Sequence, residues 1–167
     1  MEKLYRHEIG SPIGKLTLLS SDKGLCRVMF PNEKASMLTW FIDRHFPKAT
    51  IEAGGEFNFK AAAELEAYFA GKLTKFTVKL DLRSAGFYRQ VQLEVNSIPF
   101  GKTKTYGEIA RILGKPKASR AVGGGNGSNP IPIIIPCHRV LSTTGLGGFG
   151  GGLPTKKWLL EHEGVEV

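Results

Sequence analysis

Cys137 is the residue of this sequence best placed to act as a nucleophile, because it lies between Pro136 and the basic pair His138-Arg139. Proline fixes the backbone that enters the segment and removes one amide donor, and nearby positive charge favours a thiolate over a thiol. We therefore expect Cys137 to ionise readily at neutral pH and to attack an electrophile. The competing interpretation is that a lone cysteine packs as a small buried hydrophobe.

A reactive thiol needs a group that accepts its proton, and His138 is adjacent in sequence. Since neighbouring side chains generally point apart, we expect a water molecule to connect the imidazole with the sulfur. A carboxylate can orient the imidazole in turn, as in other sets of nucleophile, base and orienting group. Glu161 and Glu163, on a helix expected over residues 155–163, are the candidates. The alternative is that both are exposed acids at a helix end.

The charge of the chain points to an anionic partner. The net charge is +8 and the isoelectric point is about 9.6. Residues 1–84 carry 13 basic and 10 acidic side chains, whereas residues 100–145 carry seven basic side chains against the single acid Glu108. The positive charge is therefore concentrated around Cys137, where it favours binding of a polyanion. A solvated charged face is the simpler alternative.

Composition also limits the class of protein. Hydrophobic residues make up 41% of the 167 residues, which is enough for a folded core. The sequence shows neither the apolar run of a secretory signal nor a stretch of about 20 apolar residues. Its two cysteines lie far apart, so both are expected to be free thiols in a reducing compartment. We expect a soluble cytoplasmic protein, associated with the nucleoid if the source is prokaryotic.

Glycine content and charge both change near residue 85, which predicts two domains, 1–84 and 85–167. Six of the 21 glycines precede that point. In the first domain, residues 4–9, 15–20 and 25–30 read as strands of a small antiparallel sheet. Asn32 and Asn58 are expected to cap two helices. Cys26 falls on the third strand, where burial is its expected role.

The second domain contains a segment that resembles a helix-turn-helix. Thr105 and Glu108 fit a capping box at the start of one helix, and Pro116 suits the first turn of a second helix. Ser119, Arg120 and Ala121 belong to this second helix, and Lys117 stands at its entrance. An ordinary helical hairpin is as common on this pattern alone, but the basic clustering favours contacts with nucleic-acid phosphates.

Residues 145–150, Gly-Leu-Gly-Gly-Phe-Gly, match the dinucleotide-binding pattern G-x-G-x-x-G, but their sequence context does not fit such a site. That site needs a preceding strand, a following helix and an acidic residue about 20 positions further on, at the end of a second strand, and the chain ends before that acidic residue. A loop whose exposed backbone packs against a flat ligand fits better. No spacing of histidines and cysteines suggests a metal site.

Taken together, several separated motifs resemble the O6-alkylguanine-DNA alkyltransferase family. From about Phe87 onward they follow the family order, including residues 120–124, Asn129-Pro130, residues 136–140 and the terminal residues 158–164. The first 84 residues resemble the family more weakly, chiefly through residues 11–16. The resemblance implies an α/β (α+β) fold. A small ribonuclease H-like antiparallel sheet with helices would precede a mainly helical domain that contains the helix-turn-helix.

The resemblance also implies a role for each site residue. Cys137 would accept the alkyl group, His138 would take its proton through water, and Glu163 would orient the imidazole. Tyr106 would donate toward the leaving guanine, Arg120 would fill the gap in the base stack, and Asn129 would brace the turn before the active site. The carbonyls of Cys137 and Val140 would read the exocyclic amine. The contacts expected with substrate or DNA are completed by Ser119, Ala121, Lys117, Phe149 and Gly150.

The implied activity is DNA repair by direct reversal. An alkyl group would move from O6 of guanine, and also from O4 of thymine, in duplex DNA to Cys137, with the target base rotated out of the stack. The reaction would be irreversible, so each molecule would act once. No cofactor is implied, and no metal is expected because the cysteines of the zinc site found in some relatives are missing. We expect a monomer that binds double-stranded DNA. Whether several molecules bind cooperatively along the DNA is left open.

Two features of the loop depart from the family pattern. Phe149 and Gly150 stand where many relatives carry tyrosine and serine, and the loop is one residue shorter, so the range of alkyl groups accepted is left open. A non-catalytic lesion-binding or regulatory protein on the same scaffold is the main alternative, and Cys137 argues against it. A thiol hydrolase would need an oxyanion site that the sequence does not indicate.

Overall fold

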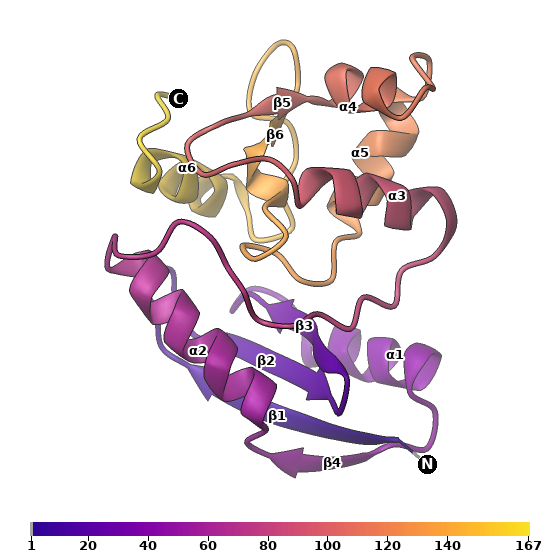
Figure 1. Ribbon diagram of the computed structural model, residues 1–167, viewed down its shortest axis with the longest axis vertical. Helices are drawn as coiled ribbons and strands as arrows, with labels where there is room; N and C mark the ends of the chain where they lie inside the picture. The colour runs from indigo at the N-terminus through magenta and orange to yellow at the C-terminus, as the bar shows by residue number, and fades with distance from the viewer. Residues whose placement is uncertain (1) are drawn as a thin grey trace. The chain divides into compact units, whose positions relative to one another are not determined.

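The computed structural model describes residues 2–167 and divides the chain into two units, Met1–Arg83 and Ser84–Val167. Figure 1 shows a sheet with two helices in the first unit and short helices joined by long connections in the second. Each unit has its own buried hydrophobic residues. The fold is the mixed one expected from the sequence, with a small sheet followed by a mainly helical part.

The first unit is built on a four-stranded sheet with the order β3-β2-β1-β4. Strands β1 (Lys3–Ile9), β2 (Leu16–Ser21) and β3 (Gly24–Met29) pair antiparallel, as predicted. A fourth strand, β4 (Thr50–Ala53), pairs parallel with β1 and was not predicted. All four of its residues are exposed, so this edge strand has no alternation of buried and exposed positions for a sequence reading to detect.

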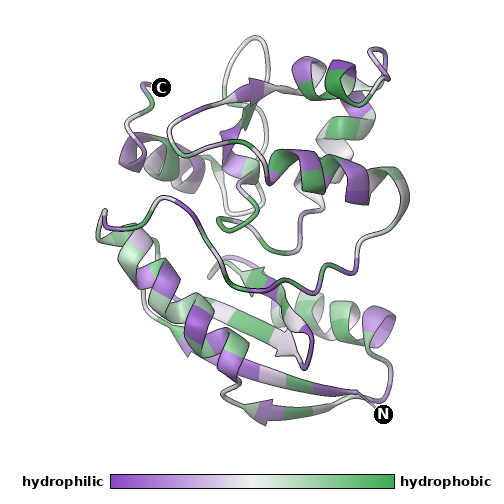
Figure 2. Ribbon diagram, in the orientation of Figure 1, coloured by the Kyte–Doolittle hydropathy of each residue, from purple (hydrophilic) through white to green (hydrophobic). Residues whose placement is uncertain are grey.

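Two helices, α1 (Ala35–His45) and α2 (Glu56–Phe69), lie on opposite faces of this sheet (Figure 1). Along α2, hydrophobic and hydrophilic positions alternate in bands (Figure 2), as expected of a helix that packs one face onto a sheet. The core beneath α1 joins residues of three strands with residues of the helix and of the turn that follows it: Leu4, Leu19, Cys26, Met29, Leu38, Phe41 and Phe46.

Neither asparagine predicted as a helix cap serves as one. Helix α1 begins at Ala35, with Lys34 at the N-cap position, two residues later than a cap at Asn32 would give. Helix α2 begins after Gly55, so Asn58 lies inside its first turn. There the Asn58 side chain is buried and donates to the carbonyls of Tyr5 and Gly54, at 2.9 and 2.8 Å. The start of α2 is set instead by the left-handed backbone of Gly55, where a Cβ would lie 2.5 Å from that of Tyr5.

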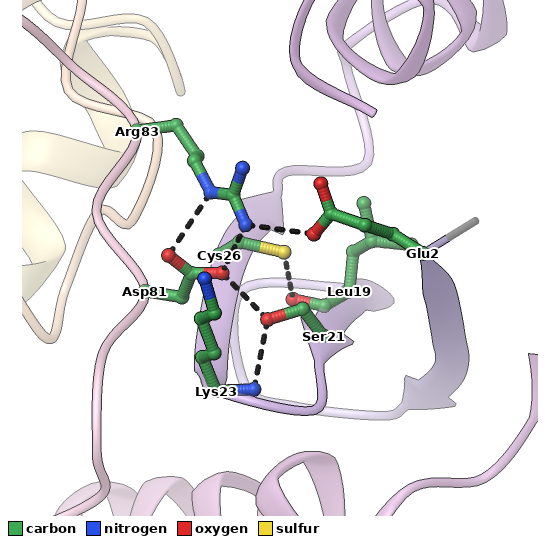
Figure 3. Close-up of polar contacts among 7 residues, drawn as sticks. All are labelled: Glu2, Leu19, Ser21, Lys23, Cys26, Asp81 and Arg83. Atoms are coloured by element: carbon green, nitrogen blue, oxygen red, sulfur yellow. Dashed lines mark hydrogen bonds and ion pairs between the residues drawn. The ribbon is translucent and has the colours of Figure 1, made fainter. Parts of the chain in front are cut away.

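The end of the first unit is fastened to the sheet by backbone hydrogen bonds and by side-chain contacts, among them those of Asp81 and Arg83 in Figure 3. Leu25 exchanges backbone hydrogen bonds with Lys79 and Asp81, at 2.8 and 2.7 Å. Arg83 donates to the carboxylates of Asp81 and Glu2. Cys26 is buried here and its thiol donates to the Leu19 carbonyl at 3.3 Å. Burial raises the pKa of this thiol far above its usual range, so Cys26 is a packing residue, as predicted.

The second unit places short elements around a buried apolar segment. They are the helices α3 (Gly86–Val95), α4 (Tyr106–Ile112), α5 (Ser119–Gly127) and α6 (Leu153–His162), and the paired strands β5 (Lys104–Thr105) and β6 (Val140–Leu141). Every residue from 130 to 140 is buried. A 3-10 turn, Cys137–Arg139, ends this segment and leads into β6.

Helices α4 and α5 are the two helices expected from the helix-turn-helix pattern. The capping box is confirmed: Thr105 accepts from the Glu108 amide, and Glu108 accepts from the Thr105 amide, both at 3.1 Å. The second helix starts later than predicted, because Pro116 lies in the turn and the first helical residue is Ser119. Helix α5 packs against α3 at Gly125, where a Cβ would lie only 3.0 Å from that of Val91.

Candidate active site

The 3-10 turn presents Cys137 at the end of the buried segment, with 5% of its surface exposed. Burial raises the pKa of Cys137 to about 11, although a hydrogen bond from Asn129 and the charge of Lys156 act in the opposite direction. The prediction of ready ionisation at neutral pH is therefore wrong for the protein without DNA. The desolvation of the sulfur outweighs the nearby positive charge, so the site needs a base to remove the proton.

His138 is fully buried and lies against Glu163, with 2.7 Å between His138 Nε2 and Glu163 Oε2. This contact assigns the hydrogen to Nε2, which donates to the carboxylate. The other nitrogen, Nδ1, is buried and has no hydrogen-bond partner within residues 2–167. Burial lowers the pKa of His138 and outweighs the opposing effect of Glu163. The imidazole is thus neutral at neutral pH, with Nδ1 available to accept a proton.

Glu163, and not Glu161, is the carboxylate that contacts His138. It is buried just after α6, and it also accepts from Arg139 Nε at 2.8 Å, Arg139 Nη2 at 3.0 Å and the Gly101 amide at 3.2 Å. Glu161 is half-exposed and pairs with Lys157 one turn earlier. The bidentate contact with Arg139 was not predicted. It fixes both oxygens of the carboxylate that orients His138.

Two asparagines join α5 and its following turn to the cysteine segment. Asn129 donates to the Ile135 carbonyl at 2.8 Å and accepts from the Ile131 amide at 3.0 Å. These bonds span Ile133, a β-branched residue with φ of 71°, so they hold a strained turn in place. Asn126, a residue that the sequence did not single out, donates to the Cys137 carbonyl at 3.2 Å. The same carbonyl accepts from the Val140 amide.

The loop before α6 lies against Tyr106. A Cβ built on Gly147 would be 2.6 Å from Tyr106 Oη, so only glycine permits this approach, and its φ of 74° also favours glycine. Phe149 is half-buried and Gly150 is exposed in the same loop. The structure therefore brings Cys137, His138, Glu163 and Asn129 together, and Tyr106 to the loop.

The residues predicted to meet DNA lie around the start of α5. Lys117, Arg120 and Ala121 are exposed and Ser119 is half-buried, at the end of the turn and the first turn of the helix. Together they form a surface with two basic side chains and two small ones, which a phosphate backbone can approach closely.

Lys156 is the functional candidate that sequence reasoning missed. It lies on the buried stripe of α6 with Leu159, Leu160 and Glu163, and it is fully buried. Its ammonium donates to the carbonyls of Val140, Leu146 and Gly148, at 2.7, 2.5 and 3.2 Å. The positions 156, 159, 160 and 163 share one helix face, and this spacing was the available signal.

Within residues 2–167 no group of three histidines, cysteines or acids is arranged to hold a metal ion. Over the same range, no helix combines the length and hydrophobicity needed to cross a membrane.

Comparisons with known proteins identify the class to which this fold and site belong. Residues 4–82 match the ribonuclease-like domain of 6-O-methylguanine DNA methyltransferase, and residues 86–165 match the DNA-binding domain of the same family. A methylated-DNA–protein-cysteine methyltransferase of Methanosarcina acetivorans is 44% identical over 162 residues, which is 96% of this chain and 99% of the relative. One from Mycobacterium tuberculosis is 44% identical over 163 residues, covering 96% and 92%.

Solved structures agree with these matches. The crystal structure of the M. tuberculosis O6-methylguanine methyltransferase superposes with a TM-score of 0.82 at 43% identity, covering 96% of this chain and 92% of the other. A structure of the M. tuberculosis protein in complex with DNA gives a TM-score of 0.82 at 42% identity, covering 95% and 92%. The chain belongs to the 6-O-methylguanine DNA methyltransferase family, and the enzyme is a methylated-DNA–protein-cysteine S-methyltransferase.

Proposed function

We propose that this protein repairs DNA by transferring a methyl or larger alkyl group from O6 of guanine in duplex DNA to Cys137, and that it also accepts an alkyl group from O4 of thymine. The observation that carries the proposal is the arrangement behind the sulfur, in which His138, Glu163 and Arg139 form one buried hydrogen-bonded set. The family supplies the reaction class, and these contacts supply a base for a thiol that burial keeps protonated.

The proposed transfer balances as a single displacement. Cys137 loses its proton through a bridging water to His138 Nδ1, and the resulting imidazolium is stabilised by Glu163. The sulfur attacks the alkyl carbon, the S–C bond forms as the C–O6 bond breaks, and guanine leaves with the electron pair. Tyr106 donates a proton toward the guanine ring. The thioether has no leaving group that water displaces easily, so each protein molecule reacts once.

Binding of the lesion is proposed to use the surface at the start of α5. Lys117, Ser119 and Ala121 would lie against the phosphate backbone, and Arg120 would occupy the space that the rotated base leaves in the stack. The Val140 carbonyl would read the exocyclic amine. In the structure the Cys137 carbonyl, proposed for the same role, already accepts from Asn126 and Val140, so the amine would have to replace one of these donors.

Other parts of the proposal concern the whole chain. The domain of residues 85–167 would hold the entire site, and residues 1–84 would form the ribonuclease H-like domain. Phe149 and Gly150 would contact the substrate, with the Gly150 main-chain amide donating to the guanine oxygen and with no hydroxyl contacts from this loop. The protein would act as a monomer with no cofactor, since the damaged base itself donates the alkyl group.

The direct test mixes the protein with duplex DNA that contains one O6-methylguanine and measures intact protein mass. The wild-type protein should gain the mass of one methyl group, and Cys137→Ala should gain none. Binding of the modified duplex with no mass gain in the wild type would instead identify a non-catalytic lesion-binding protein.

A further inference from the structure

Lys156 is a fully buried lysine whose partners are main-chain carbonyls. Its Nζ donates to the carbonyl oxygens of Val140, Leu146 and Gly148. An ammonium has three hydrogens, so these three acceptors fill its capacity. Within residues 2–167, the groups that act on the Lys156 charge do not include a carboxylate. The contacts of Lys156 therefore fix the positions of these three carbonyls and of the two segments that carry them.

Burial of this charge is costly, because an ammonium without a counter-charge loses most of its hydration. Burial accordingly lowers the pKa of Lys156 to about 8. A leucine at the same position of the apolar stripe would avoid the cost. A lysine at this position thus calls for an explanation beyond packing of α6.

The three acceptors belong to two segments, one that follows Cys137 and one that lies against Tyr106. Val140 directly follows the turn that carries Cys137, and its carbonyl is one of the two proposed to read the exocyclic amine. Leu146 and Gly148 flank Gly147, the residue that lies against Tyr106. One side chain thus connects the segment after the nucleophile with the loop beside the proposed proton donor.

We propose that Lys156 is a positioning residue for alkyl transfer, holding the Val140 carbonyl and loop residues 146–148 where the target base meets Cys137. The inference rests on the proposed function. It has an electrostatic consequence as well, because the Lys156 charge favours the thiolate of Cys137 and disfavours the imidazolium of His138. Loss of the Lys156 charge should therefore slow the transfer of the alkyl group to Cys137 and leave the binding of DNA largely unchanged.

The experiment compares Lys156→Met and Lys156→Gln with Lys157→Met, a matched control because Lys157 is an exposed lysine on the same helix. Three quantities are measured on the full chain with O6-methylguanine duplex. They are the maximal transfer rate, the DNA concentration that gives half of that rate, and the pH dependence of the maximal transfer rate. Amide hydrogen exchange of residues 142–150 reports the order of the loop. Lys156→Gln retains an N–H donor without the charge, and it provides the test if the methionine variant does not fold.

We expect both Lys156 variants to transfer methyl about 10- to 100-fold more slowly at saturating DNA, with the half-saturating concentration changed less than about threefold. Their pH profile should move to higher pH, and loop exchange should rise. Lys157→Met should match the wild type. A wild-type rate, pH profile and loop exchange in Lys156→Gln would overturn the proposal. If the wild type itself accepts no methyl group, the proposed function fails, and loop exchange alone still tests whether Lys156 holds the loop.

Discussion

At the scale of residues, the chemistry of the site depends on how far each group is desolvated. Burial keeps Cys137 protonated and His138 neutral. At neutral pH the nucleophile therefore still carries its proton, and the base is able to accept one. Glu163 fixes the tautomer of His138, and Arg139 supplies the counter-charge that a buried carboxylate requires. The geometry therefore favours proton transfer at the moment of attack over a resident thiolate.

Glu163→Gln should lose both stability and activity, because it leaves the Arg139 guanidinium buried without a counter-charge. Breaking a buried pair of this kind costs roughly 3–5 kcal/mol of unfolding free energy. Methyl transfer should also slow, since an amide stabilises the imidazolium less well. Glu161→Gln, on the exposed side of the same helix, should unfold and react like the wild type. Urea unfolding and single-turnover transfer measure both effects, and equal behaviour of the two variants would contradict the assignment of Glu163.

The stability of the protein should fall on acidification in a way that depends on His138. Burial lowers its native pKa below the usual 6.5, so below about pH 6.5 the unfolded chain binds a proton that the native site does not. The unfolding free energy should then drop by up to about 1.4 kcal/mol per pH unit for this one group. Urea unfolding at a series of pH values between 7.5 and 5 should show a shallower drop for His138→Gln than for the wild type. Parallel curves would contradict the prediction.

At the scale of elements, α5 combines low helix propensity with close packing. Four of its nine residues are glycine, and each glycine inside a helix costs roughly 0.5–1 kcal/mol relative to alanine. Gly125 has a packing reason, its approach to Val91, whereas a Cβ on Gly123 would meet nothing within 4 Å. The helix that carries Arg120 is thus held by its packing against α3 more than by its own propensity.

A comparison of Gly125→Ala with Gly123→Ala isolates this packing. Both substitutions gain the same helix propensity, so that term cancels between them. Gly125→Ala should be less stable than Gly123→Ala by about 1–3 kcal/mol, because α3 and α5 must move apart. Thermal or urea unfolding of the two variants gives the difference. Equal stabilities would mean that Val91 yields without cost.

Arg120→Ala tests the role proposed for the exposed start of α5. Transfer from duplex DNA should slow markedly, while transfer from a free alkylguanine base should change little, because a free base needs no rotation out of a stack. Lys117→Ala is the control for charge alone. It should weaken binding to modified and unmodified duplex alike and reduce the salt dependence by about one phosphate contact. Equal losses of Arg120→Ala on both substrates would refute the base-rotation role.

At the scale of the whole molecule, the sequence predicted what local chemistry determines. The capping box of Thr105 and Glu108, the three antiparallel strands and the burial of Cys26 follow from neighbouring residues. Strand β4 was missed because an exposed edge strand has no hydrophobic period, and Asn58 was misassigned because the two glycines before it start the helix earlier.

Most residues of the candidate site could be predicted from the sequence, but their protonation states could not. The adjacency of Cys137 and His138 is local, but a choice between Glu161 and Glu163 depends on which face of α6 is buried. Lys156 was missed because lysines are seldom fully buried, and only the fold places three carbonyls around its ammonium. The ionisation of Cys137 was misjudged because desolvation is a property of the folded molecule.

The central claim is that Cys137 alone accepts one alkyl group per protein molecule. A titration of the protein with an increasing excess of O6-methylguanine duplex, followed by peptide mass analysis, tests it directly. We predict a plateau at one methyl group per molecule, carried by the peptide that contains Cys137, with Cys26 unmodified. Repeated turnover, or methylation that persists in Cys137→Ala, would contradict it.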